Sequence, residues 1–156
     1  MRLLKQVHKL FAAGALLSLS SMILVVGVQI FSRFFLEITP HWTEEAARIF
    51  FIYSVAFGTG TAINQGDFVR LDLVGKYLSP VSSRILQFFT EIITIFFSII
   101  LTTQSLYFIR LGMDEKSAAL QIPMSFIFLS ITITGIAIFI FTLENLYYTV
   151  KGTKSK

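Results

Sequence analysis

SAALQIPMSFIFLSITITGIAIFIFTL, residues Ser117–Leu143, is the longest stretch of the chain without a charged residue. A helix needs about 20 predominantly apolar residues to cross the hydrocarbon core of a bilayer, and this stretch exceeds that length. Backbone groups in hydrocarbon have no water to bond, so the segment must be helical. This stretch alone indicates an integral membrane protein.

Three earlier stretches have the same character. Ile85–Ile109 is interrupted only by Glu91, while Leu10–Ser32 and Ile49–Gly66 carry no charge. The sequence therefore predicts one all-α integral membrane domain over residues 1–156, with four transmembrane helices at about 10–32, 46–66, 84–109 and 117–143. Because Leu111–Lys116 is short, the third and fourth helices should form an antiparallel hairpin.

The first span has one alternative reading, a cleavable signal peptide, because Arg2, Lys5 and Lys9 precede its apolar stretch. The apolar part of a signal peptide is typically about 7–15 residues and ends at a cleavage site with small residues. Leu10–Ser32 is longer and runs through bulky side chains to Arg33. We therefore expect an uncleaved helix.

The composition excludes several classes of function. Hydrophobic residues make up 54% of the chain and charged residues 14%, whereas a soluble domain carries about 25% charge. The absence of cysteine excludes disulfides and thiolate metal sites. His8 and His41 both lie outside the long apolar stretches, which argues against a haem held inside the bilayer. We find no catalytic, substrate-binding or metal-binding set, and expect no enzyme activity and no cofactor.

The distribution of basic residues predicts the orientation. Nine lysines and arginines fall in the N-terminal segment, the middle loop and the C-terminal segment: Arg2, Lys5, Lys9, Arg70, Lys76, Arg84, Lys151, Lys154 and Lys156. Four fall on the opposite side: Arg33, Arg48, Arg110 and Lys116. The positive-inside rule therefore places both termini and the middle loop in the cytoplasm. The net charge of +4 fits such a membrane protein and does not imply nucleic-acid binding.

Two connecting segments are predicted to form short interfacial amphipathic helices. In Phe68–Leu78, apolar residues recur at helical spacing. In the other, Trp42 suits the interface, and Arg48 follows Glu44 and Glu45 at a spacing that allows pairing on one helical face. The charged group could brace a partner protein, or it could form a purely internal pair at the start of the helix. We favour the first.

The third span carries a polar stripe on one helical face. Its members follow steps of three and four residues: Gln87, Glu91, Thr94, Ser98, Thr102 and Ser105. Ionisable residues inside a membrane are functional candidates by default. The stripe could be a pathway for an ion or proton, or a seam where polar groups bond across packed helices. A pathway usually needs several titratable groups, so one glutamate favours the seam.

Small residues mark the second span. Ser54, Gly58 and Ala62 are spaced by four and allow another helix to approach closely. Together with the polar groups above, they complete our set of candidates for a partner interface: Trp42, Glu44, Glu45, Arg48, Ser54, Gly58, Glu91 and Ser98.

Several of these residues carry a resemblance to a known family. The chain resembles the small membrane subunit (DctQ-like) of TRAP transporters, the tripartite ATP-independent periplasmic transporters. The positions that match the family pattern are Trp42, Glu44, Glu45, Arg48, Gly58, Gly66, Val69 and Asp72. Asp67 stands where the family often has histidine, and Ser125 where tryptophan is common. The motif region covers about 30 residues, and the four-span layout covers the whole chain.

The resemblance implies a role and partners. It implies a heterodimer with a large membrane subunit that carries the substrate and sodium sites, in the bacterial inner membrane. An extracytoplasmic binding protein would deliver an organic acid such as a C4-dicarboxylate or sialic acid. The small subunit would enlarge the fixed scaffold of the large one.

Two rival functions stay open from the residues themselves. The chain could be a self-sufficient small oligomeric transporter that uses Glu91 for coupling. It could also be the membrane anchor of a redox complex, although the lack of intramembrane histidine and of cysteine counts against this.

Overall fold

The computed structural model describes residues 2–36, 40–65 and 80–151. These contain four helices: α1 (Arg2–Phe35), α2 (His41–Gln65), α4 (Pro80–Leu111) and α5 (Ser125–Lys151). All four are long and apolar enough to cross a membrane, so the predicted all-α membrane fold is confirmed. The predicted helix Phe68–Leu78, with Gly66, Asp67, Val69 and Asp72, lies outside the described residues.

α1 and α4 extend beyond their apolar stretches at both ends, α2 does so at its start, and α5 does so at its end. The segment Trp42–Arg48 is not a separate helix, because α2 runs without a break from His41. These helix ends continue into polar sequence, because backbone groups near the membrane interface are still stabilised by hydrogen bonds within the helix.

The connection between α4 and α5 is longer than predicted, because α5 begins at Ser125 and not at Ser117. Two local features keep the preceding residues out of a helix. Gln121 has a positive φ of 56°, and Pro123 disfavours helical backbone at the residue before it. Residues 112–124 instead form a compact loop in which Lys116 and Pro123 pair as an antiparallel bridge. The Ser125 amide closes the loop by donating to the Gly112 carbonyl at 3.0 Å.

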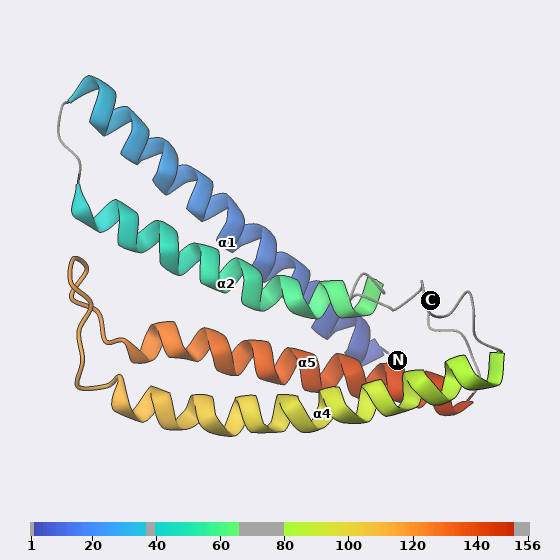
Figure 1. The fold of residues 1–156 in the computed structure, drawn as a ribbon. Helices are drawn as coiled ribbons and strands as arrows, with labels where there is room; N and C mark the ends of the chain where they lie inside the picture. Colours follow the sequence, from blue (N-terminus) through green and yellow to red (C-terminus); the bar gives the residue numbers. More distant parts are fainter. Residues whose placement is uncertain (1, 37–39, 66–79, 152–156) are drawn as a thin grey trace.

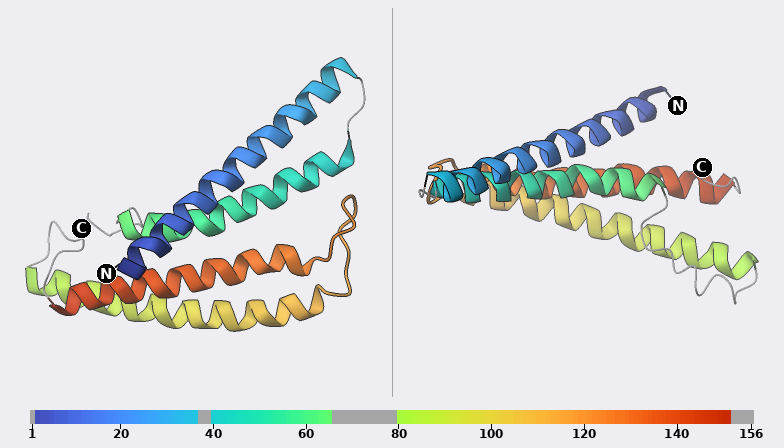
Figure 2. Two further views of the ribbon diagram at one scale, coloured as in Figure 1. Left: turned by 180° about the vertical axis from the view of Figure 1, so that it is seen from behind. Right: turned by 90° about the horizontal axis from the view of Figure 1, so that it is seen from above.

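The four helices pack in a row and do not form a closed bundle. Within the described residues, the extensive contacts join α1 to α2, α2 to α5, and α5 to α4 (Figure 1). α1 starts near the C-terminal end of α5, and its other end lies far from α5 (Figures 1 and 2). The starts of α1 and α4 and the ends of α2 and α5 therefore share one end of the molecule.

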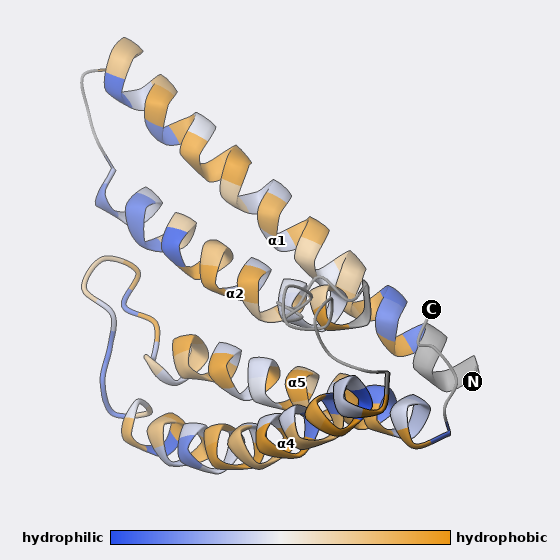
Figure 3. Cartoon of the chain, turned by 45° about the vertical axis from the view of Figure 1, so that its right-hand side comes forward, coloured by the Kyte–Doolittle hydropathy of each residue, from blue (hydrophilic) through white to orange (hydrophobic). Residues whose placement is uncertain are grey.

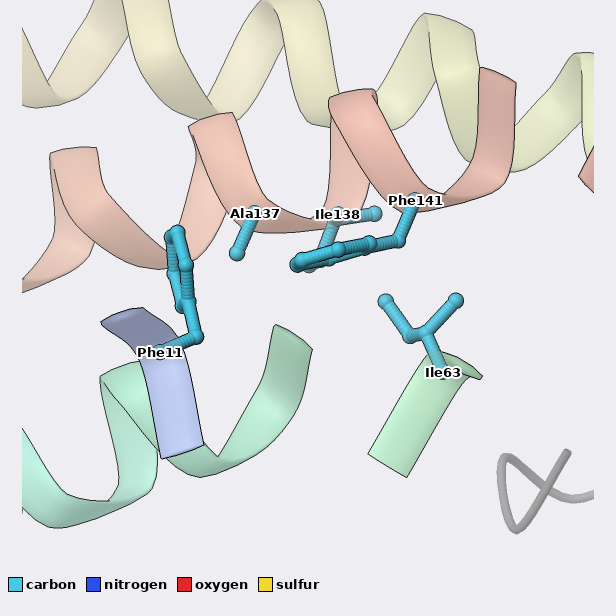
Figure 4. Packing of buried hydrophobic residues seen from close by; sticks show 5 residues of the cluster. All are labelled: Phe11, Ile63, Ala137, Ile138 and Phe141. Carbon is cyan, nitrogen blue, oxygen red and sulfur yellow. The ribbon is translucent and has the colours of Figure 1, made fainter. Parts of the chain in front are cut away.

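A small apolar core lies where α1, α2 and α5 meet. Its members are Phe11 of α1, Ile63 of α2, and Ala137, Ile138 and Phe141 of α5 (Figure 4). The rings of Phe11 and Phe141 meet edge to face, with centroids 5.4 Å apart. Gly60 faces the same two rings, and a Cβ at this position would collide with both. The core therefore depends on a glycine at position 60.

Most other apolar side chains point outward. Hydrophobic residues run along the middle of the helices, and hydrophilic residues gather mainly toward their ends (Figure 3). Many of the large hydrophobic side chains are exposed. Lipid tails are as apolar as leucine, so apolar burial supplies little drive for helix association inside a bilayer. Polar contacts and close packing must therefore hold the row together.

Candidate functional site

A polar seam joins α4 to α5 along most of the predicted stripe. The side chains of Ser98 and Ser105 are 0% and 1% exposed, and the Ser105 hydroxyl lies 2.8 Å from the hydroxyl of Thr132. Gly135 of α5 faces Thr102 so closely that a Cβ would collide with its hydroxyl. The packing reading of the stripe is thus confirmed in this region. Ser98 offers no surface to another chain.

Glu91 lies in the same seam, near the start of α4 and the end of α5. Its side chain is 7% exposed. Its Oε1 atom accepts hydrogen bonds from the amide of Gln87 at 3.1 Å and from the hydroxyl of Thr149 at 2.9 Å. The carboxyl group therefore links α4 to α5 inside the chain, which suits a structural role better than contact with a partner.

Glu45 holds the loop between α4 and α5. Its Oε2 atom accepts hydrogen bonds from the backbone amides of Ala119 and Leu120, both at 2.8 Å. Among the described residues, no salt bridge joins Glu44 or Glu45 to Arg48, so Arg48 acts on Glu45 only as a charge at longer range. A carboxyl group near the start of α2 thus ties that helix to a loop far away in sequence.

The start of α2 also has a buried and an exposed side. Thr43 is 0% exposed, and its hydroxyl donates to the carbonyl of Pro40 at 2.7 Å, which closes the first turn. Trp42 is 44% exposed, and Glu44 and Arg48 are exposed as well. These three side chains remain available to a second protein.

The small residues of α2 are half-buried. The hydroxyl of Ser54 donates to the carbonyl of Phe51 at 2.7 Å, so it is satisfied within its own helix. A Cβ added at Gly58 would meet open space, with nothing within 4 Å. Within the chain, Gly58 is therefore not needed for helix packing, and a role at an interface stays a prediction.

One contact between α1 and α5 was not predicted from the sequence. The Nε2 atom of His8 lies 3.1 Å from Oε2 of Glu144, and the imidazole ring stacks on Phe141 with centroids 4.5 Å apart. The signal was weak: His8 lies just before the first apolar stretch and Glu144 just after the last. Both positions were predicted on the same side, but only the fold shows that they meet.

An apolar groove of about 400 Å³ lies between α1, α2 and the start of α5. Its lining includes Ser18, Phe50, Tyr53 and Phe126, and the Tyr53 hydroxyl donates to the Phe126 carbonyl at 2.6 Å. The described residues contain no group of three or more histidine or acidic side chains placed to bind a metal ion. The polar contacts of the described residues join helices to one another, to the loop 112–124 or to their own turns, and none of these contacts forms a charged pocket for a small acid.

Comparison with known proteins agrees with these observations. The model of the family described as "Tripartite ATP-independent periplasmic transporters, DctQ component" matches residues 22–152. The match includes all of α2, α4 and α5 and the last part of α1, from residue 22 onward. No curated protein matches the chain.

Proposed function

The chain belongs to the DctQ family, the small membrane component of TRAP transporters, and on this premise we propose that it is a non-catalytic scaffold for the large membrane subunit. The observation that carries the scaffold role is the internal use of its polar groups. Glu45, Glu91, Ser105 and Thr132 all bond within the chain. A transport pathway would need such groups to face a hydrated cavity or a substrate.

The open row of helices supports the same role. α1 and α4 each have most of their apolar surface exposed, and a membrane partner could cover much of it. A scaffold needs breadth and internal rigidity, and the seam between α4 and α5 together with the Glu45–loop contact would provide the rigidity. Trp42, Glu44 and Arg48 would add an interfacial contact to the large subunit.

The transport reaction itself would be carried by the other components. We propose uptake of an organic acid, such as a C4-dicarboxylate or sialic acid, driven by an ion gradient, with sodium as the coupling ion. An extracytoplasmic binding protein would deliver the acid, and the large subunit would hold the substrate and ion sites. The small subunit would lie in the bacterial inner membrane as a heterodimer with the large one.

Reconstitution tests this assignment. The chain would be co-expressed with the large subunit, purified through a tag on one partner and placed in liposomes with the binding protein. We expect both subunits to co-purify, and uptake of the acid to require both subunits and an inward sodium gradient. The isolated small subunit should show no saturable binding of the acid by calorimetry. Transport by either subunit alone, or micromolar binding by the isolated chain, would contradict the proposal.

A further inference from the structure

Gln104 is a polar side chain on the outward surface of α4. It is exposed, and its amide makes no hydrogen bond within the described part of the chain. The exposed threonines of α4 differ, because the hydroxyls of Thr90 and Thr103 donate to carbonyls of their own helix. Gln104 therefore carries hydrogen-bonding capacity that the described chain does not use.

The amide lies too deep to reach interfacial water. Arg110 ends the apolar part of α4, and at 1.5 Å per residue Gln104 lies about 9 Å deeper along the helix axis. Side chains of an α-helix tilt toward its N-terminus, which for α4 lies at the opposite side of the membrane. The amide of Gln104 thus points toward the middle of the bilayer.

The residues around Gln104 form a continuous surface, which we call the Gln104 face. Residues four and seven positions away lie on the same side of a helix. The four residues at these spacings before and after Gln104 are all exposed: Phe97, Ile100, Phe108 and Leu111. The Gln104 face is therefore an apolar strip with one unsatisfied amide at its centre.

Lipid tails cannot satisfy this amide, because hydrocarbon offers no hydrogen-bond donor or acceptor. A transmembrane helix can, through a hydroxyl, an amide or a free backbone carbonyl. We propose that a transmembrane helix of the large subunit packs on the Gln104 face and bonds to Gln104. This inference rests on the proposed function, because the family consists of components of a multi-part transporter.

Replacement of the amide tests the bond. In the co-expressed complex, Gln104→Leu keeps the bulk of the side chain and removes its hydrogen-bonding groups. A hydrogen bond between membrane helices changes association about three- to thirty-fold, so recovery of the large subunit with the variant should fall within this range. Thr103→Val is the matched control, because its hydroxyl already bonds within α4, and it should leave recovery unchanged. Equal recovery of both variants and the wild type would overturn the proposal.

Photocrosslinking tests the surface without removing Gln104. Phe97 lies on the Gln104 face and is 55% exposed, while Leu106 is 51% exposed and lies about 200° around the helix from Gln104. Benzoylphenylalanine at position 97 should crosslink to the large subunit, and at position 106 it should not. Products formed only with lipid, only with a second copy of this chain, or equally from both positions would each overturn the proposal.

The proposed function and the assignment of the Gln104 face can fail separately. If the wild-type chain does not co-purify with the large subunit at all, the proposed function is wrong. If the wild type co-purifies while Gln104→Leu has no effect and position 97 gives no crosslink, only the assignment of the Gln104 face is wrong.

Discussion

Glu45 illustrates how one side chain can fix a loop at the surface of a membrane protein. The two backbone amides that it binds lie within one turn, at Ala119 and Leu120. A single carboxyl oxygen thus satisfies two donors that a loop of this shape leaves free. Because α2 supplies the carboxyl group, the position of the loop depends on the packing of α2 against α5.

Removing this acceptor should loosen the loop. Glu45→Ala leaves the amides of Ala119 and Leu120 to water, so we expect faster proteolysis within residues 112–124 and a lower Tm in detergent. Glu44→Ala is the matched control, because Glu44 is exposed and makes no hydrogen bond within the described residues. Similar proteolysis of both variants would show that the contact does not hold the loop.

Two substitutions of Glu91 distinguish a structural role of its carboxyl group from a role in ion coupling. Glu91→Gln keeps an oxygen that can accept from Thr149 and Gln87, so transport and stability should stay close to wild type. Glu91→Leu removes the acceptor of the half-buried Thr149 hydroxyl, at about 1–3 kcal/mol, and should lower the free energy of unfolding. Uptake in liposomes and thermal unfolding measure the two effects. Loss of transport in Glu91→Gln with unchanged stability would instead support the rival small transporter.

At the scale of elements, the contact between α4 and α5 depends on close approach at Gly135. A Cβ there would collide with the hydroxyl of Thr102, so Gly135→Ala forces the two helices apart. Overpacking of this kind costs about 1–3 kcal/mol, and Tm of the isolated chain should fall.

Gly58→Ala provides the comparison, because its Cβ would meet open space. We expect unchanged stability for the isolated chain and reduced recovery of the large subunit if another helix approaches there. Unchanged recovery would remove Gly58 and its neighbour Ser54 from the candidate interface. An unchanged Tm in Gly135→Ala would argue against the packing seen at Thr102.

The elements also show which features the sequence could predict. Long uncharged stretches predicted four helices, because a bilayer admits few other structures, and the spacing of Ser98 and Ser105 predicted the seam. The predicted start of the fourth helix at Ser117 was wrong, because α5 begins at Ser125. Hydropathy does not distinguish a helix from an apolar loop such as Ala118–Met124. The Glu45–loop and His8–Glu144 contacts could not be predicted, since each joins residues far apart in the chain.

At the scale of the whole molecule, the row of helices leaves two broad faces uncovered. α1 contacts α2 along much of its length, and the contact of His8 with Glu144 adds a link to α5 near the chain termini. The opposite end of α1 lies apart from α5 (Figure 2). A partner could therefore cover either face of the row without displacing the core at Phe11 and Phe141.

The number of basic residues differs between the two membrane sides of the chain, and this difference predicts the orientation in the membrane. From the sequence, nine lysines and arginines are predicted on the side of the two termini and the middle loop, against four on the opposite side. By the positive-inside rule the termini should face the cytoplasm and the loop 112–124 should face outward. Because the chain has no cysteine, single cysteines can report this without background.

Ala118 in the loop and Lys151 at the end of α5 are both exposed, so each can take a label. In intact cells, an impermeant maleimide should react with Ala118→Cys and not with Lys151→Cys. After the membrane is permeabilised, both variants should react, which controls for buried or modified thiols. The reverse pattern would mean that the charge difference does not set the orientation. It would also move the exposed surface of Trp42, Glu44 and Arg48 to the cytoplasmic side, away from any extracytoplasmic component.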